Sequence, residues 1–141
     1  MSRRRDPFGA PDEPTRRREA RERSVELLYE AEMKSCDVAD VLADQVTELD
    51  PFTVGLVTGI ATQRDELSAR LGELLNEGWT VNRLGTCDRI ILLQGLLELE
   101  RGAAPVAVVI NEAIELAHRW GATDRSPALI NGVLAAAVET R

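Results

Sequence analysis

The 141-residue chain has few of the residues that build metal centres, disulfide frameworks or catalytic triads. It contains one histidine and two cysteines, Cys36 and Cys87, which lie far apart in the sequence. Both cysteines stand within helical patterns, so we interpret them as small hydrophobic residues of a protein from a reducing compartment. The sequence also lacks a glycine-rich phosphate loop and a Cys/His zinc spacing. It therefore favours a protein that is not an enzyme and that holds no cofactor or metal ion.

Long apolar runs and an export signal are also missing. The longest purely apolar runs, such as residues 106–110, are far shorter than the roughly 20 residues that span a membrane. Arg3, Arg4 and Arg5 could begin a twin-arginine signal, but the polar segment 6–14, DPFGAPDEP, stands where the apolar part of that signal would be. We therefore expect a cytoplasmic protein that makes no membrane contact.

Positive charge is scarce and unevenly distributed. The net charge is −7, yet residues 1–24 hold eight arginines against five acidic residues. The remaining residues, 25–141, hold nine basic residues against nineteen acidic ones. A short basic segment on an acidic body suggests that the segment meets an anion locally, while the body repels a bulk polyanion. With 44% hydrophobic residues, the chain has enough apolar side chain for one compact domain.

Apolar residues recur every three or four positions along most of the chain, which predicts an all-α fold. No segment combines strand-like alternation with hairpin turns of the Asn-Gly type. Residues 1–14 contain three prolines and almost no apolar periodicity, so we expect a disordered basic arm ahead of a domain over residues 15–141. Helices are expected over 15–32, from Asp37 through Val46, over 51–76, over 79–101 as a short helix and a longer one that stops at Gly102, from Pro105 to a stop at Gly121, and from Ser126 onward.

The segment over 51–76 is predicted to be the longest helix. Asp50 is expected to be its N-cap, and Pro51 stands in its first turn. Gly55 and Gly59 lie four residues apart within it and are expected to let another backbone approach closely. This glycine face offers one route to a homodimer.

One spacing resembles a metal-binding motif. Glu115 and His118 form the Glu-x-x-His pattern that helix bundles use in two-metal carboxylate sites. Such a site needs a second pattern of the same kind, and His118 is the only histidine of the chain. Glu112, Glu115 and Arg119 lie opposite the apolar stripe of their helix. A solvated face with an ion pair between Glu115 and Arg119 is therefore the favoured interpretation.

The first predicted helix begins with four arginines, Arg16, Arg17, Arg18 and Arg21, at the end where the helix dipole disfavours cations. Each cation in the first turn costs about 0.3 to 1 kcal/mol, so an acidic protein gains little from this arrangement unless an anion meets it. At 100° per residue, Tyr29 lies on nearly the same line as Arg18 and points away from the core stripe. An exposed aromatic ring beside guanidinium groups is typical of surfaces that bind single-stranded nucleic acid.

Several motifs occur in the order and spacing of the NusB transcription antitermination family, which the chain resembles over about residues 16–138. The VINEAIELA and NGVL blocks are specific in combination, whereas the arginine block alone is not. The motifs are Arg17-Arg18-x-Ala20-Arg21 with Leu28-Tyr29, Trp79-Thr80-x-x-Arg83-Leu84, Asp88-Arg89-x-Ile91-Leu92, VINEAIELA at 109–117, and Ser126-Pro127 followed by Asn131-Gly132-Val133-Leu134.

The resemblance implies an all-α, NusB-like domain of about seven helices in two three-helix sub-bundles, without enzymatic activity. It implies binding to the single-stranded boxA element of ribosomal RNA leader transcripts together with NusE, a small-subunit ribosomal protein. The pair is expected to join RNA polymerase with other Nus factors and to suppress termination. The residues that the resemblance places at the RNA are Arg16, Arg17, Arg18, Arg21, Tyr29, Asp124 and Leu129, and those that it places at NusE are Asp88, Arg89 and Leu92.

Three positions depart from the family pattern. Leu129 stands where the family usually has a phenylalanine, Leu97 stands where an aromatic residue is frequent, and Leu92 or Leu93 replaces an arginine. If the family's phenylalanine stacks on a base, stacking here comes from elsewhere or is weaker, and one stacked base contributes about 1 to 3 kcal/mol. We therefore expect modest RNA affinity for this protein alone.

Two alternatives stand beside this interpretation. One is a helical protein-interaction module, homodimeric through the face of Gly55 and Gly59, whose basic segment only aids solubility. A steep fall of RNA affinity with salt would separate the two, because phosphate contacts release counterions. The other is an RNA-modifying protein, since NusB-like domains also occur fused to RNA methyltransferases, but the sequence shows no catalytic segment.

Overall fold

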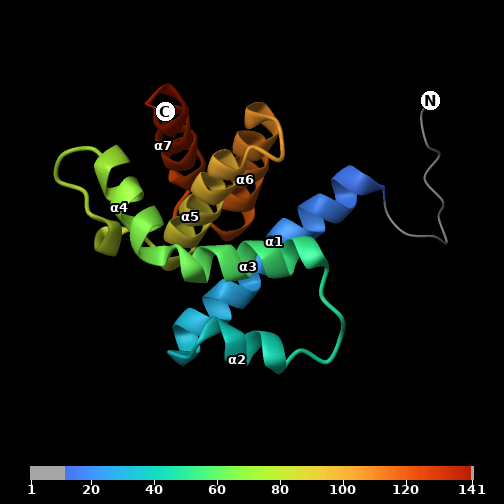
Figure 1. Cartoon of the computed structure of the whole chain (residues 1–141). Coiled ribbons are helices and arrows are strands. Elements are labelled where there is room, and N and C mark those ends of the chain that lie inside the picture. Colours follow the sequence, from blue (N-terminus) through green and yellow to red (C-terminus); the bar gives the residue numbers. More distant parts are fainter. Residues whose placement is uncertain (1–11, 141) are drawn as a thin grey trace, which may run out of the picture.

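The computed structural model describes residues 12–140, and this part of the chain is all-helical, as the sequence predicts (Figure 1). Residues 1–11, which make up most of the expected arm, and residue 141 lie outside the described residues. Glu13 and Pro14, the last residues of the expected arm, already belong to the first helix. The elements are α1 (Glu13–Lys34), α2 (Val38–Ala43), α3 (Pro51–Thr62), α4 (Arg64–Leu74), the short 3-10 helix η1 (Val81–Arg83), α5 (Thr86–Arg101), α6 (Val106–Trp120) and α7 (Ser126–Glu139).

The helices pack in two groups (Figure 1). The first group is α1, α2 and α3. In the second group, α5, α6 and α7 pack on one another, and α4 lies against α5 and α7. α5 also contacts α1 and α3, so it joins the two groups. This arrangement agrees with the two sub-bundles expected from the resemblance, with α4 added to the second.

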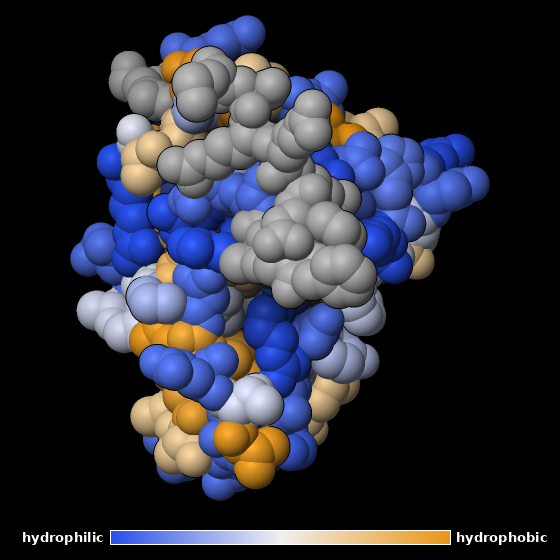
Figure 2. Space-filling view, turned by 90° about the vertical axis from the view of Figure 1, so that its right-hand side faces the viewer, coloured by the Kyte–Doolittle hydropathy of each residue, from blue (hydrophilic) through white to orange (hydrophobic). Residues whose placement is uncertain are grey.

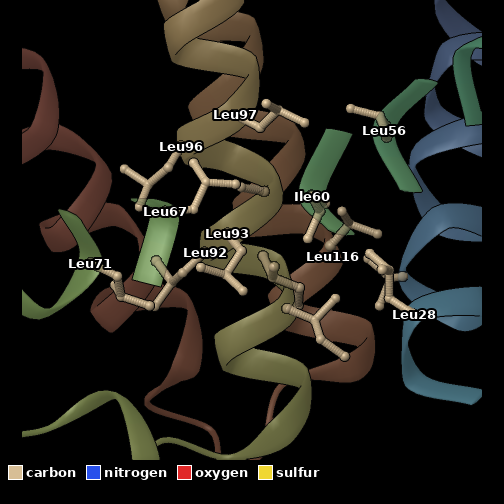
Figure 3. Close-up of a cluster of buried hydrophobic side chains, with 14 of the residues drawn as sticks. Leu28, Leu56, Ile60, Leu67, Leu71, Leu92, Leu93, Leu96, Leu97 and Leu116 are labelled. Atoms are coloured by element: carbon tan, nitrogen blue, oxygen red, sulfur yellow. The ribbon is translucent and has the colours of Figure 1, made fainter. Parts of the chain in front are cut away.

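The centre of the core is α5, whose side chains are buried on nearly all sides. Eleven of its 16 residues are buried. Such all-round burial is typical of a helix inside a bundle, whereas a surface helix shows one apolar stripe. Apolar side chains of both groups surround it, with Leu28, Leu56 and Ile60 on one side and Leu67 and Leu71 on the other (Figure 3).

Local signals fix where the helices begin and end. Asp12 caps α1 by accepting a hydrogen bond from the Thr15 backbone N–H at 2.9 Å, and Asp50 caps α3 in a similar way at 2.8 Å. α5 ends at Gly102, whose φ of 63° is the left-handed conformation that glycine adopts without strain. The predicted cap at Asp50 and the predicted stops at Gly102 and Gly121 are confirmed.

The prediction of one continuous helix over 51–76 is wrong. The segment is two helices, α3 and α4, with Gln63 between them at φ −104° and ψ 21°. The break lets α3 pack on α1 and α2 while α4 packs on α5 and α7. The apolar pattern did not reveal it, because one turn-like residue hardly alters the spacing of three and four. The second helix also ends earlier than expected, at Ala43, which leaves Val46 fully exposed.

The face that carries Gly55 and Gly59 is covered by a side chain of the same chain. The Arg101 guanidinium lies across both glycines and donates a hydrogen bond to the Gly55 carbonyl oxygen at 3.2 Å. A Cβ at Gly59 would overlap this guanidinium and would stand 2.9 Å from Leu97 Cδ2. The expected approach of another backbone is therefore wrong, and the homodimer alternative loses the surface on which it depended.

Candidate nucleic-acid interface

Three arginines in the first turns of α1, Arg16, Arg17 and Arg18, form the α1 arginine cluster. Their side chains are 49%, 40% and 57% exposed, so all three reach solvent. Arg17 lies over the Phe52 ring, with 4.2 Å between the guanidinium carbon and the ring centroid. Stacking orients a guanidinium by its face and leaves its N–H edge available. Hydrophilic residues cover much of this side of the molecule (Figure 2).

Carboxylates of the same chain stand close to this cluster. Arg17 Nε donates a hydrogen bond to Glu13 at 3.1 Å. Arg16 lies 3.7 Å from the Glu13 carboxylate and 3.6 Å from the Asp50 carboxylate. The two Arg16 distances are longer than hydrogen bonds, so these ion pairs are loose. Arg16 is therefore the member of the cluster least committed to an internal partner.

The polar face of α6 is exposed at Glu115 and Arg119, as the sequence predicts, but two of its residues form ion pairs with α1. Arg18 donates two hydrogen bonds to Glu112, both at 3.0 Å, and the bond to this carboxylate raises the pKa of the Arg18 guanidinium. Further along the two helices, Arg119 pairs with Glu22 of α1. The expected ion pair between Glu115 and Arg119 is therefore wrong, because Arg119 finds its partner on the neighbouring helix.

Arg21, the fourth arginine of the predicted surface, is buried. Its side chain is 5% exposed and donates three hydrogen bonds to Glu98 of α5 at 2.8 to 3.0 Å. The backbone around it is also fixed, since Gln94 donates to the Arg21 carbonyl at 3.2 Å and the Thr53 hydroxyl donates to the Ala20 carbonyl at 3.0 Å. The expectation that Arg21 faces outward with the other arginines is wrong. It lies at the edge of the core stripe, where Glu98 supplies a buried counter-charge.

These contacts explain how the start of α1 tolerates its arginines. Acidic residues of α1, α5, α6 and the segment before α3 supply counter-charges that the sequence alone did not reveal. An external anion is therefore not needed to account for the arrangement. The part that remains available to a ligand is the exposed portion of the α1 arginine cluster.

The other residues predicted to meet RNA lie farther along the molecule. Tyr29 is 41% exposed, two turns beyond Glu22 on α1, which confirms that it points away from the core. Asp124 is exposed in the loop between α6 and α7, and Leu129 is half-buried in the first turn of α7. Leu129 lines a cavity of about 730 Å³ between η1 and the start of α7, which we call the Trp79 hollow.

The three residues expected at a protein partner are largely inside the fold. Leu92 is completely buried, and Asp88 is 5% exposed. The Asp88 carboxylate accepts hydrogen bonds from the Ser126 hydroxyl at 2.9 Å and from the loop backbone at 3.1 Å, so it fixes the loop between α6 and α7 against α5. The Arg89 side chain is 14% exposed and pairs with Glu32. A direct partner contact by Asp88 or Leu92 is thus contradicted by their burial.

Glu32 ties the C-terminal half of α1 to α4 and α5. Its carboxylate accepts hydrogen bonds from Arg89 at 2.5 Å and from Arg64 at 3.0 Å. The bond from Arg89 is the main reason that the pKa of Glu32 lies below its ordinary value. Arg64 lowers this pKa further, while partial burial opposes the shift. These bonds hold the end of α1 beside the start of α5.

The remaining groups that could carry chemistry are separate from one another. Within residues 12–140, no group of three or more histidine, cysteine or acidic residues is placed to hold a metal ion. Both cysteines are free and half-buried, and burial raises the pKa of the Cys87 thiol, which lowers its reactivity at neutral pH. Across the same residues, no helix is both long enough and apolar enough to cross a membrane.

Comparison with known proteins decides the family. A model of the NusB family matches residues 18–139. The chain belongs to the NusB family. The transcription antitermination protein NusB of Saccharopolyspora erythraea is 40% identical over 125 residues, which cover 84% of this chain and 83% of the relative. The protein of the same name from Thermobifida fusca is 37% identical over 129 residues, which cover 89% of this chain and 90% of the relative.

Solved structures of NusB proteins share the fold. NusB from T. maritima matches with a TM-score of 0.75 at 29% identity, over 84% of this chain and 87% of that chain. A NusB and NusE complex with double-stranded RNA matches with a TM-score of 0.76 at 19% identity, over 90% of this chain and 98% of that chain, a likeness that concerns the fold alone. NusB membership also agrees with the expectation that the chain is not an enzyme.

Four residues near the candidate surface of this NusB protein had not been assigned a role from the sequence. Phe52 orients Arg17, and Trp79, Arg83 and Arg125 line the Trp79 hollow. A signal for Trp79 was present in the sequence, because this large apolar residue follows a Gly in a polar segment and belongs to no apolar stripe. Such a position favours an exposed ring, but only the fold shows what lies beside it.

Proposed function

We propose that this NusB protein is a transcription antitermination factor that binds single-stranded boxA RNA of ribosomal RNA leader transcripts. It acts with NusE and other Nus factors on RNA polymerase in the cytoplasm. The observation that carries the proposal is the α1 arginine cluster, three adjacent arginines that stay 40% to 57% exposed on a chain of net charge −7. Relatives named as transcription antitermination proteins support the antitermination role, and a solved NusB and NusE complex with double-stranded RNA supports RNA and NusE as partners.

In this proposal the RNA runs along α1 from the arginine cluster to Tyr29, crossing from the side of Arg16 and Arg17 to the line that Arg18 shares with Tyr29. Tyr29 lies thirteen residues beyond Arg16, which is about 20 Å along the helix at 1.5 Å per residue. Arg16 and Arg17 bind phosphates, and a base stacks on the Tyr29 ring. Arg18 contributes less, because Glu112 occupies two of its donors. The RNA then continues towards the loop between α6 and α7.

NusE binds the same protein at a separate surface in this proposal. Asp88 and Leu92 support that surface only indirectly, because both are buried. Asp88 holds the loop between α6 and α7, and Leu92 packs within the core. Arg89 keeps a small exposed edge, although Glu32 binds its guanidinium. NusE increases RNA affinity by adding its own contacts to an RNA that this acidic chain binds modestly.

Binding of a labelled single-stranded boxA-type RNA, with and without NusE, tests the proposal. The double variant Arg16→Gln/Arg17→Gln removes two exposed charges and leaves the buried ion pair of Arg21 with Glu98 intact. The matched control, Lys34→Gln/Arg70→Gln, removes the same charge at the far end of α1 and on α4. We expect the cluster variant to weaken RNA binding at least tenfold and the control to bind like the unmodified protein.

The protein-interaction alternative makes the opposite prediction. It expects binding of NusE that is independent of RNA, and no RNA affinity above that of any acidic protein. If the unmodified protein fails to bind boxA-type RNA even with NusE present, the exposed arginines form only a solvated face. The protein-interaction module is then the better account.

A further inference from the structure

Trp79, in the segment before η1, carries a large aromatic ring that is half exposed. Its exposed fraction is 51%, although tryptophan is highly buried on average. Trp79 and Leu129 line two adjacent hollows on the surface of η1 and α7. The larger one is the Trp79 hollow, and its volume of about 730 Å³ is in the range of small-ligand sites. Trp79 is the one aromatic residue among those that line it.

The edge of this hollow is cationic. Arg83 donates a hydrogen bond to a nearby carbonyl oxygen at 2.8 Å, and its guanidinium carbon lies 5.8 Å from the centroid of the Trp79 ring. Arg125 is exposed at the start of α7. The one carboxylate in the lining, Asp88, already accepts two hydrogen bonds, and the exposed Asp124 is not among the lining residues. An anion that approaches the hollow therefore meets Arg83 and Arg125 first.

We propose that one nucleobase of the bound RNA stacks on Trp79 in this hollow, with the neighbouring phosphates facing Arg83 and Arg125. An exposed aromatic face with flanking guanidinium groups is the combination that binds single-stranded nucleic acid with little base preference. The inference rests on the proposed function, because it adds a second stacking position to the same RNA-binding surface. It also explains how a chain with the aliphatic Leu129 in this hollow keeps an aromatic platform there.

Neighbouring residues of α5 link the hollow to the C-terminal part of α1. Asp88, in its lining, is followed directly by Arg89, and Arg89 is held by Glu32 of α1 at 2.5 Å. Glu32 is three residues, or about one turn, beyond Tyr29. In the proposal, the RNA strand leaves the α1 arginine cluster, passes Tyr29 and then enters the hollow.

Tryptophan fluorescence tests the stacking directly, because the chain has only two tryptophans, Trp79 and Trp120. The variant Trp120→Phe leaves Trp79 as the single reporter, and Trp79→Phe leaves Trp120. Both are titrated with single-stranded boxA-type RNA, with NusE present if the unmodified protein needs it. We expect RNA to quench the emission of Trp79 strongly and that of Trp120 weakly. Equal quenching of the two reporters would overturn the stacking on Trp79.

RNA affinity gives the second readout. We expect Trp79→Ala to weaken binding roughly 5- to 150-fold, the range of one stacked base, and Trp79→Phe to recover part of the loss. Trp120→Ala is the matched control and keeps the affinity, and urea unfolding of Trp79→Ala shows whether the fold is intact. If Trp79→Ala binds like the unmodified protein while Arg16→Gln/Arg17→Gln binds weakly, the inference is wrong and the proposed function stands. Absence of RNA binding by the unmodified protein overturns both.

Discussion

The buried ion pair between Arg21 and Glu98 makes a strong prediction about stability. The two side chains are 5% and 9% exposed and share three hydrogen bonds of 2.8 to 3.0 Å. Removal of one partner leaves the other charge buried without compensation, which costs about 3 to 5 kcal/mol. We therefore expect Arg21→Met to lower the free energy of unfolding by about that amount, and Glu98→Met to do the same.

The double variant Arg21→Met/Glu98→Met is expected to behave differently. It leaves no buried charge and fills the site with apolar atoms of similar volume, so its free energy of unfolding should lie within about 1 kcal/mol of the unmodified protein or above it. Urea unfolding measures this. With an m-value of about 2 kcal/mol per M, each single variant shifts the midpoint down by about 1.5 to 2.5 M. A shift below about 0.5 M in the single variants would show that the guanidinium is solvated and would refute the reasoning.

The same variants separate a structural role of Arg21 from an RNA contact. If Arg21 acts only through the fold, the double variant keeps the RNA affinity of the unmodified protein. If the double variant is fully folded and still binds RNA at least tenfold more weakly, Arg21 contacts RNA as the family resemblance implies. Measurement of RNA affinity on a folded double variant therefore decides between the two roles.

Three further predictions concern other contacts of the fold. The hydrogen bond from Arg89 lowers the pKa of Glu32 in the folded protein. The ionised carboxylate therefore stabilises the fold at pH values above the unfolded-state pKa of Glu32. This stabilisation is lost as the pH falls through the lower folded-state pKa. In acid urea titrations Glu32→Gln should lose less stability than the unmodified protein, and equal losses would contradict this. Ser126→Ala removes a donor from a buried carboxylate and should lower the free energy of unfolding by about 1 to 3 kcal/mol. Gly55→Ala should raise the free energy of unfolding by about 0.5 to 1 kcal/mol, because a Cβ at Gly55 would have ordinary contact distances. Gly59→Ala should not raise it, because a Cβ at Gly59 would overlap Arg101.

The helices of this protein were predictable where a local signal marked them. The apolar stripe of the last helix, with Ile130, Val133 and Leu134, is buried as expected, and the stops at Gly102 and Gly121 fall where the sequence placed them. Gly102 ends its helix in the left-handed conformation that glycine adopts without strain, and a repeating apolar stripe is supported by many residues. These features depend little on the rest of the chain.

The candidate site was less predictable because it depends on residues distant in sequence. On a helical wheel Arg21 lies between the core stripe and the surface, and its burial depends on Glu98, which lies 77 residues away. Glu112 and Glu22 likewise decide where Arg18 and Arg119 point. Long charged side chains reach several positions from one backbone site, so their partners follow from tertiary packing and not from local spacing.

The central claim is that exposed arginines at the start of α1 bind RNA phosphates. The most direct test is the salt dependence of boxA-type RNA affinity for the unmodified protein and for Arg16→Gln/Arg17→Gln. Each phosphate contact to a single strand contributes about 0.7 to the slope of log K against log salt, so loss of two contacts should reduce the slope by about 1.4. The control Lys34→Gln/Arg70→Gln should keep the original slope. An unchanged slope in the cluster variant, or an equal reduction in the control, would contradict the account.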